Sequence, residues 1–164
     1  MRFILVLAMI LFAASPSIAG EWQRYTDPVF GYAVELPDDG FDTEADPARN
    51  GLTLYEQNGR GQIDVYAFAN DKGLSLKQVR DALSQADRIK EITYSRAGTS
   101  WFVVSGYYRR ANDETGDLIF YAKFMMSADR TALSVFEASY PVGDKERYDP
   151  IIERIEDTLT RPAV

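Results

Sequence analysis

The chain has 164 residues, of which 46% are hydrophobic, 13% are aromatic and 26% are charged. This composition is typical of a folded globular protein and argues against a largely disordered chain. Because the formal net charge is −7 and no stretch concentrates Lys and Arg, we predict no binding to nucleic acid or to an anionic membrane surface. The absence of cysteine and histidine excludes disulfides, thiol nucleophiles, Ser-His-Asp triads and histidine-based zinc sites.

Residues 1–19 are predicted to form a cleavable signal peptide. Arg2 precedes the apolar run Phe3–Ala14, and small residues at Ser17 and Ala19 stand where signal peptidase requires them. As a helix this run would span about 18 Å, which is too short for a hydrocarbon core about 30 Å thick. A membrane anchor is therefore disfavoured.

Cleavage would release residues 20–164, whose length suits a single domain. Without a cysteine for lipid attachment, the mature chain is expected to be free rather than a lipoprotein. We therefore expect a periplasmic or secreted protein with no stable membrane anchor after leader cleavage.

The first half of the mature chain predicts strands joined by turns. Asn58-Gly59 is a strong signal for a tight turn between two of them, and Pro37 should end an earlier one. The acidic segment 38–51 is predicted to be a polar loop. The strands are expected over residues 21–26, 32–36, 52–57 and 62–69.

A first helix is predicted after Ser75, which can form a capping box with Gln78. Apolar residues then recur at intervals of three or four, which gives one stripe that can face a sheet. The stripe consists of Leu76, Val79, Leu83, Ala86 and Ile89 or Lys90.

Three apolar strands follow, over residues 100–108, 118–126 and 132–140, with residues 112–116 connecting the first two. The segment 100–108 is apolar on both faces and is expected to be central in the sheet.

A last helix is predicted from a second apolar stripe. Asp149-Pro150 either begins this helix or lies in a first turn that starts near Lys145. The stripe consists of Tyr148, Ile151, Ile152, Ile155 and Leu159.

These elements predict an α+β fold, namely an α/β/α sandwich with a central, mainly antiparallel sheet and one helix on each face. Short turns between the later strands favour antiparallel pairing, and strands with two apolar faces require a layer on each side. The abundant aromatic residues could line a pocket, but at strand spacing they are expected to form the two core layers.

Three phrases of the sequence resemble the PsbP/Mog1-like superfamily, close to its exported bacterial, DcrB-like branch. They are FGYAVELP over residues 30–37, SWFVVSG over 100–106 and YDPIIERI over 148–155. The resemblance implies a binding or assembly role with a protein partner. It implies no shared set of catalytic residues and no cofactor.

Candidate sites are few. Glu35, Asp64 and Glu137 lie on predicted strands and could form a carboxylate pair, but their alternation places them at exposed or edge positions. The sequence contains no nucleophile elbow, phosphate-binding loop or dinucleotide fingerprint. We therefore predict no catalytic residues, with a carboxylate-based hydrolase as an alternative.

The acids Asp42, Glu44 and Asp46 alternate as calcium ligands can. However, Pro47 and Thr53 replace the glycine and the bidentate glutamate of an EF-hand, so solvated acids explain the pattern as well. A small-ligand or calcium-binding domain is the alternative function.

The cations Arg109, Arg110 and Lys123 are candidates for a surface that contacts an anionic partner, if they meet at one end of a hairpin. Solvated charges at the hairpin end are the other interpretation. Our leading hypothesis from the sequence is an exported, non-enzymatic module that contacts a protein partner.

Overall fold

The structure, a computed structural model, describes residues 21–109 and 118–164. The predicted signal peptide and the predicted connection over residues 112–116 lie outside these residues. Within them, no helix is both long enough and apolar enough to cross a membrane.

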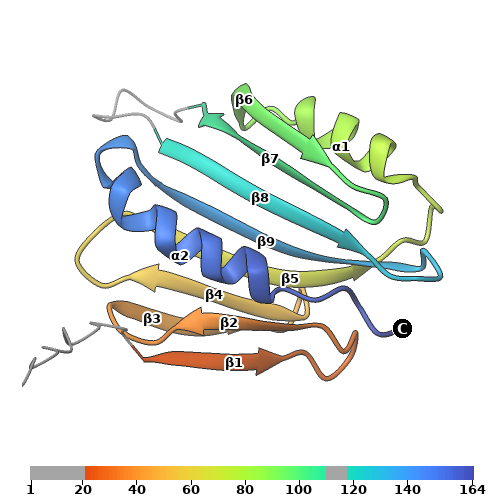
Figure 1. Cartoon of the computed structure of the whole chain (residues 1–164), viewed down its shortest axis with the longest axis horizontal. Coiled ribbons are helices and arrows are strands. Elements are labelled where there is room, and N and C mark those ends of the chain that lie inside the picture. The colour runs from red at the N-terminus through yellow and green to blue at the C-terminus, as the bar shows by residue number, and fades with distance from the viewer. Residues whose placement is uncertain (1–20, 110–117) are drawn as a thin grey trace, which may run out of the picture.

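A seven-stranded antiparallel sheet dominates the fold, with the strand order β3-β4-β5-β9-β8-β7-β6 (Figure 1). Short turns join most of its neighbouring strands, as antiparallel pairing allows. Its strands are β3 (Phe41–Asp46), β4 (Gly51–Glu56), β5 (Gln62–Ala69), β6 (Ile89–Ala97), β7 (Trp101–Tyr108), β8 (Leu118–Met126) and β9 (Ala132–Pro141). The strands β1 (Trp22–Thr26) and β2 (Ala33–Pro37) form a separate antiparallel pair.

The alternating side chains of β9 enter two hydrophobic cores on opposite faces of the sheet. Phe136 and Ala138 belong to the core under the helix α2 (Lys145–Thr158), whereas Leu133 and Val135 belong to the core on the side of α1 (Leu76–Ser84). Successive residues of a strand point to opposite faces, so the two helices cover opposite sides of the sheet. The predicted α+β architecture, with a mainly antiparallel sheet and a helix on each face, is therefore confirmed.

The helix α2 is buried deeply in its core. Tyr148, Ile152 and Ile155 are buried, and Tyr148 stacks on Tyr140 of β9 with ring centroids 4.4 Å apart. Pro150 lies inside the helix, so of the two predicted starts the one near Lys145 is correct. After the helix, the backbone N–H of Thr160 donates to the carbonyl of Ala33, which ties the chain end to β2.

The helix α1 begins as predicted and ends earlier. Ser75 and Gln78 form the capping box, but the helix ends at Ser84 and none of its residues is buried. Ile89 still packs in the same core, but as the first residue of β6 rather than as part of the helical stripe. The helix α1 is short, and its main contacts are with β6 and β7. It therefore covers a limited part of its side of the sheet.

The sequence analysis missed both edge strands of the sheet. β3 lies in the segment predicted as a polar loop, and β6 follows directly on the segment predicted as helix. Phe41 is the one buried residue of β3 and Ile89 the one buried residue of β6. An edge strand that is exposed on both faces shows no apolar alternation, so hydrophobic periodicity cannot reveal it. Because β6 is not predicted, β7 is expected at the centre of the sheet, although β9 holds that position.

The unequal burial of the two helices predicts unequal contributions to stability. Ile155→Ala removes a fully buried side chain of α2 and should lower the free energy of unfolding by about 2–5 kcal/mol. Leu83→Ala, on the partly buried face of α1, should cost clearly less. Urea denaturation of both variants would measure the difference, and equal losses would contradict the shallow packing of α1.

Candidate functional site

The part of the sheet that α1 leaves uncovered is a polar and aromatic surface, which we call the open face. Tyr55 of β4 and Phe68 of β5 are exposed to 43% and 36%, although both are large hydrophobic residues. Their neighbours on this side are mostly polar. The open face consists of Arg49, Thr53, Tyr55, Gln62, Asp64, Tyr66, Phe68, Arg88, Tyr108 and Glu137.

Two carboxylates lie at the centre of the open face. Asp64 of β5 and Glu137 of β9 are direct partners in the antiparallel register, and only 8% and 6% of each residue is exposed. The prediction that these acids occupy exposed or edge positions is therefore wrong, because β5 and β9 are inner strands. Two like charges opposite each other destabilise a sheet unless counter-charges offset them. The third acid, Glu35 on β2, instead pairs with Arg154 at 2.8 Å.

The carboxylate of Asp64 is fully engaged by neighbouring side chains. Its Oδ1 accepts hydrogen bonds from the hydroxyl of Thr53 at 2.7 Å and from Nη2 of Arg49 at 3.0 Å. Its Oδ2 accepts from the amide of Gln62 at 2.8 Å. Both oxygens of this buried carboxylate therefore have protein donors.

Glu137 is held in the same way from the other side. Arg88 binds it in a bidentate manner, with Nη1 at 2.6 Å from Oε1 and Nη2 at 2.9 Å from Oε2. The hydroxyl of Tyr108 also donates to Oε1. A bidentate arginine pair fixes both partners in orientation as well as in position.

Each arginine lies over a tyrosine ring. The guanidinium carbon of Arg49 is 4.8 Å from the ring centre of Tyr66, and that of Arg88 is 5.3 Å from the ring centre of Tyr108. The side chains of Arg49 and Arg88 nevertheless remain 45% and 50% exposed. Buried carboxylates below and aromatic rings beside them thus hold two guanidiniums at the surface in fixed positions.

Burial perturbs the tyrosines of this cluster. It raises the pKa of Tyr66 and of Tyr108 far above the usual value near 10, and the charge of Glu137 adds to the effect in both. Both phenols are therefore neutral hydrogen-bonding groups in the physiological range, and neither is a candidate base or nucleophile.

The predicted calcium ligands do not converge. Asp42, Glu44 and Asp46 lie on one side of the extended strand β3, where alternate residues are about 7 Å apart. Asp46 pairs with Arg49 at 2.5 Å, and Asp42 accepts a hydrogen bond from Gln57 at 2.9 Å. Among the residues that the structure describes, no group of three or more acids could hold a metal ion.

The predicted cationic cluster is also divided. Lys123 pairs in register with Val103 and lies on the α2 side, where its Nζ donates to the carbonyl of Glu156 at 2.7 Å. Arg109 follows the far end of β7, and its Nε donates to the carbonyl of Ile89 at 3.1 Å. Arg110 lies outside the described residues. Arg109 and Lys123 therefore do not form one surface.

The sequence analysis missed Arg49 and Arg88, the two cations that define the open face. Arg49 lies in the segment predicted as a polar loop, and Arg88 lies within the span of the first predicted helix. One signal was present: Asp64 and Glu137 interrupt strongly apolar strands, and a charge on an inner strand requires a partner.

Comparison with known proteins identifies the fold. The structure of cyanobacterial PsbP (CyanoP) from Synechocystis superposes with a TM-score of 0.57 and 18% identity, covering 92% of this chain and 98% of that one. The Ran-binding protein Mog1p of Saccharomyces cerevisiae gives a TM-score of 0.60 at 9% identity, covering 87% and 96%. A point mutant of Mog1 gives 0.59 at 9% identity, with the same coverage.

This chain has the PsbP/Mog1-like fold. The resemblance deduced from the sequence phrases is thereby confirmed for the fold. No model of a known protein family matches the sequence, and no curated protein matches it either. Because one fold supports many unrelated functions, the function of this chain has to be argued from its own surfaces.

The raised tyrosine pKa values predict how stability depends on pH. A phenol whose pKa is higher in the folded than in the unfolded chain stabilises the fold fully below pH about 10, and this contribution is lost as the pH rises further. The free energy of unfolding should therefore fall above pH 10, by up to about 1.4 kcal/mol per pH unit for each such tyrosine.

Tyr66→Phe removes one of these groups and should make the alkaline decline less steep, with little change at pH 7. Urea denaturation at several pH values, together with absorbance titration of tyrosinate, would measure both effects. An alkaline decline as steep as that of the wild type would show that Tyr66 ionises equally in both states.

Proposed function

We propose that this chain is an exported, non-enzymatic binding module that contacts a protein partner through the open face. The observation that carries the proposal is the pair of arginines, Arg49 and Arg88, which buried carboxylates hold beside tyrosine rings on a part of the sheet that no described helix covers.

The composition of the open face is that of a protein interface. Tyrosine and arginine are enriched among the residues that dominate binding energy, and such residues cluster at the centre of an interface. On the open face Tyr55 and Phe68 are the exposed aromatic anchors. Tyr55 pairs with Gln62, six residues before Phe68 on β5, so the two anchors lie about 20 Å apart along the sheet, and Phe68 stacks on Tyr66.

The rigidity of the open face also favours binding. Ordering a flexible side chain on association costs about 0.5–1.5 kcal/mol. Arg88 is already held by two hydrogen bonds to Glu137, and Arg49 is held by Asp46 and Asp64. A partner that contacts these guanidiniums would therefore order them at little further cost.

The same geometry argues against an enzyme that uses Asp64 and Glu137. A carboxylate pair that cleaves a glycosidic bond must present its oxygens to substrate and water across a cleft. Here the carboxylate oxygens accept hydrogen bonds from Thr53, Gln62, Tyr108 and the two arginines. The pair acts as an anchor for the arginines instead.

A protein-binding role for this chain is supported by one of its structural neighbours, since Mog1p of Saccharomyces cerevisiae is a Ran-binding protein. At 9% identity the likeness concerns the fold, so the partner of this chain is a separate question. The predicted leader over residues 1–19 supports export, to the periplasm or the exterior.

A capture experiment with matched variants tests the proposed interface. The domain beginning at Gly20 is immobilised and exposed to a periplasmic extract, and bound proteins are quantified by mass spectrometry. The double variant Tyr55→Ala/Phe68→Ala should lose a specific partner. A loss of about 2 kcal/mol at one central residue corresponds to about thirtyfold weaker binding.

Tyr94→Ala is the matched control, because Tyr94 is 47% exposed but its register with Ser105 places it on the α2 side of the sheet. It should retain the partner. If both variants bind the same proteins as the wild type, or if Tyr94→Ala alone loses them, the open face is not the interface.

The export prediction has its own test. When the full chain is expressed in a bacterium with a periplasm, the mature protein should occur in the periplasmic fraction and begin at Gly20, as shown by N-terminal sequencing. Ala19→Phe places a bulky side chain where signal peptidase accepts small ones, so the uncleaved precursor should accumulate. A cytoplasmic protein that still begins at Met1 would contradict export.

A further inference from the structure

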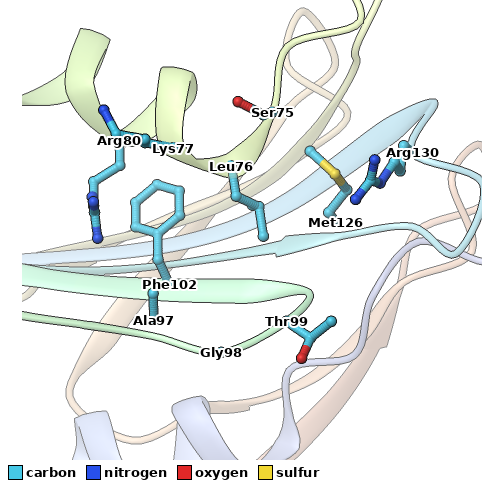
Figure 2. Close-up of a pocket in the computed structure, with 10 residues that line it drawn as sticks. All are labelled: Ser75, Leu76, Lys77, Arg80, Ala97, Gly98, Thr99, Phe102, Met126 and Arg130. Carbon is cyan, nitrogen blue, oxygen red and sulfur yellow. The ribbon is translucent and has the colours of Figure 1, made fainter.

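A second surface of the protein, independent of the proposed interface, has the chemistry of a ligand site. Between the start of α1 and the hairpin of β6 and β7 lies a pocket of about 340 Å³ (Figure 2). Apolar side chains from three elements meet in it: Leu76 of α1, Phe102 of β7 and Met126 of β8. Figure 2 shows Arg80 beside the ring of Phe102 and Arg130 near Met126, with Leu76 between them.

The pocket continues along the same helix. A second pocket of about 410 Å³ also includes Arg80 and extends over Ile92 and Val104 to Arg109. We call the two pockets together the α1 groove. Its size falls in the range of small-molecule sites, which are about 300–1,000 Å³.

The charge of the α1 groove is opposite to that of the chain. The sequence has 25 acidic and 18 basic residues, yet the charged residues lining the first pocket are all cations: Lys77, Arg80 and Arg130. The second pocket adds Lys90 and Arg109 against a single acid, Glu91. Such a concentration of positive charge in an acidic protein attracts anions to this groove.

Two of these cations have no counter-charge in the part of the chain that the structure describes. Lys77 pairs with Asp81 at 2.5 Å, but within residues 21–109 and 118–164 neither Arg80 nor Arg130 has an ion-pair partner. The backbone of Arg130 is nevertheless held in place, since the side-chain amide of Asn70 donates a hydrogen bond to the carbonyl of Arg130 at 2.9 Å. Unlike Arg49 and Arg88, whose guanidiniums are paired with buried carboxylates, these two guanidiniums are paired with no carboxylate of the described residues.

We propose that the α1 groove binds a small amphipathic carboxylate, with the anionic head on Arg80 or Arg130 and the hydrophobic body over Leu76, Phe102 and Met126. The apolar floor argues against a purely polar anion such as phosphate, which would gain nothing from it. The cationic rim argues against a neutral hydrocarbon, because only an anion recovers the charge-assisted hydrogen bonds.

Decanoate is a suitable probe, and decanol and acetate supply its two halves separately. Calorimetric titration of the mature domain measures the affinity, and amide shifts in two-dimensional NMR locate the site. Decanoate should bind, and decanol and acetate should each bind much more weakly. The shifted amides should lie in α1, in the hairpin of β6 and β7 and at the turn that contains Arg130.

Replacing the arginine that holds the head, either Arg80→Gln or Arg130→Gln, should weaken decanoate binding by about five- to tenfold, as expected for loss of a hydrogen bond between charged groups, and the other replacement should weaken it less. Arg96→Gln is the matched control: it removes the same charge from an exposed residue of β6 whose register with Val103 places it on the other side of the sheet. Thermal melting of each variant without ligand checks that the fold is intact.

The proposal is overturned if decanol and decanoate bind equally, if neither Arg80→Gln nor Arg130→Gln loses more affinity than Arg96→Gln, or if the amide shifts are confined to other parts of the protein. Absence of heat and of shifts at millimolar decanoate would also overturn it. Because the open-face residues are not involved, Tyr55→Ala/Phe68→Ala should bind decanoate like the wild type, which separates this test from that of the protein interface.

Discussion

The fold depends on β9, because this strand has to be covered on both faces. Hydrogen bonding to β5 on one side and β8 on the other leaves it no free edge, and its alternating side chains enter two cores. On the α2 side this requirement is met completely, because Phe136 and Ala138 are buried under the helix.

On the α1 side a nine-residue helix reaches only part of the strand. Leu133 and Val135 are covered by apolar groups, whereas Glu137 is covered by Arg88 and Tyr108. The open face exists because side-chain ion pairs replace a helix there.

That replacement creates a coupling between distant segments. Asp64 and Glu137 face each other across the β5–β9 pair, and two adjacent carboxylates tolerate burial only if cations reach both. The cations come from the turns that precede β4 and β6, so these turns are fixed by residues in the middle of the sheet. An apolar pair at positions 64 and 137 would serve stability as well or better. What the charged pair supplies in addition is the placement of two half-exposed guanidiniums, which is why we assign it a role in recognition rather than in stability.

Sequence patterns predicted the parts of this fold that depend on local chemistry or on two-sided burial. The capping box of Ser75 and Gln78, the alternation over residues 62–69 and the apolar stripe of α2 each follow from neighbouring residues, and each is present. The edge strands β3 and β6 were not predictable from apolar alternation, because their side chains are exposed on both faces and each strand is stabilised by backbone pairing with its neighbour.

The open face could not be predicted for a different reason. Arg88 and Glu137 are 49 residues apart, and only the strand register brings them together. Composition could indicate that buried acids need partners, but it could not say which arginines provide them.

The pairing state of the arginines, rather than their number, distinguishes the two surfaces of this protein. On the open face each guanidinium is paired with a buried carboxylate, and Asp42 and Glu44 of β3 lie on the same side of the sheet. This surface therefore has no excess of positive charge, and it is rigid and rich in aromatic rings, as suits a protein partner. In the α1 groove Arg80 and Arg130 lack such partners among the described residues and lie over an apolar floor, so the surface retains positive charge that an anion can satisfy. The overall charge of −7 conceals this difference, because it averages over a chain in which acids and bases are unevenly placed.

A fold shared with PsbP and Mog1 at 18% and 9% identity cannot specify either surface. Both follow from where this sequence places its arginines relative to its buried carboxylates.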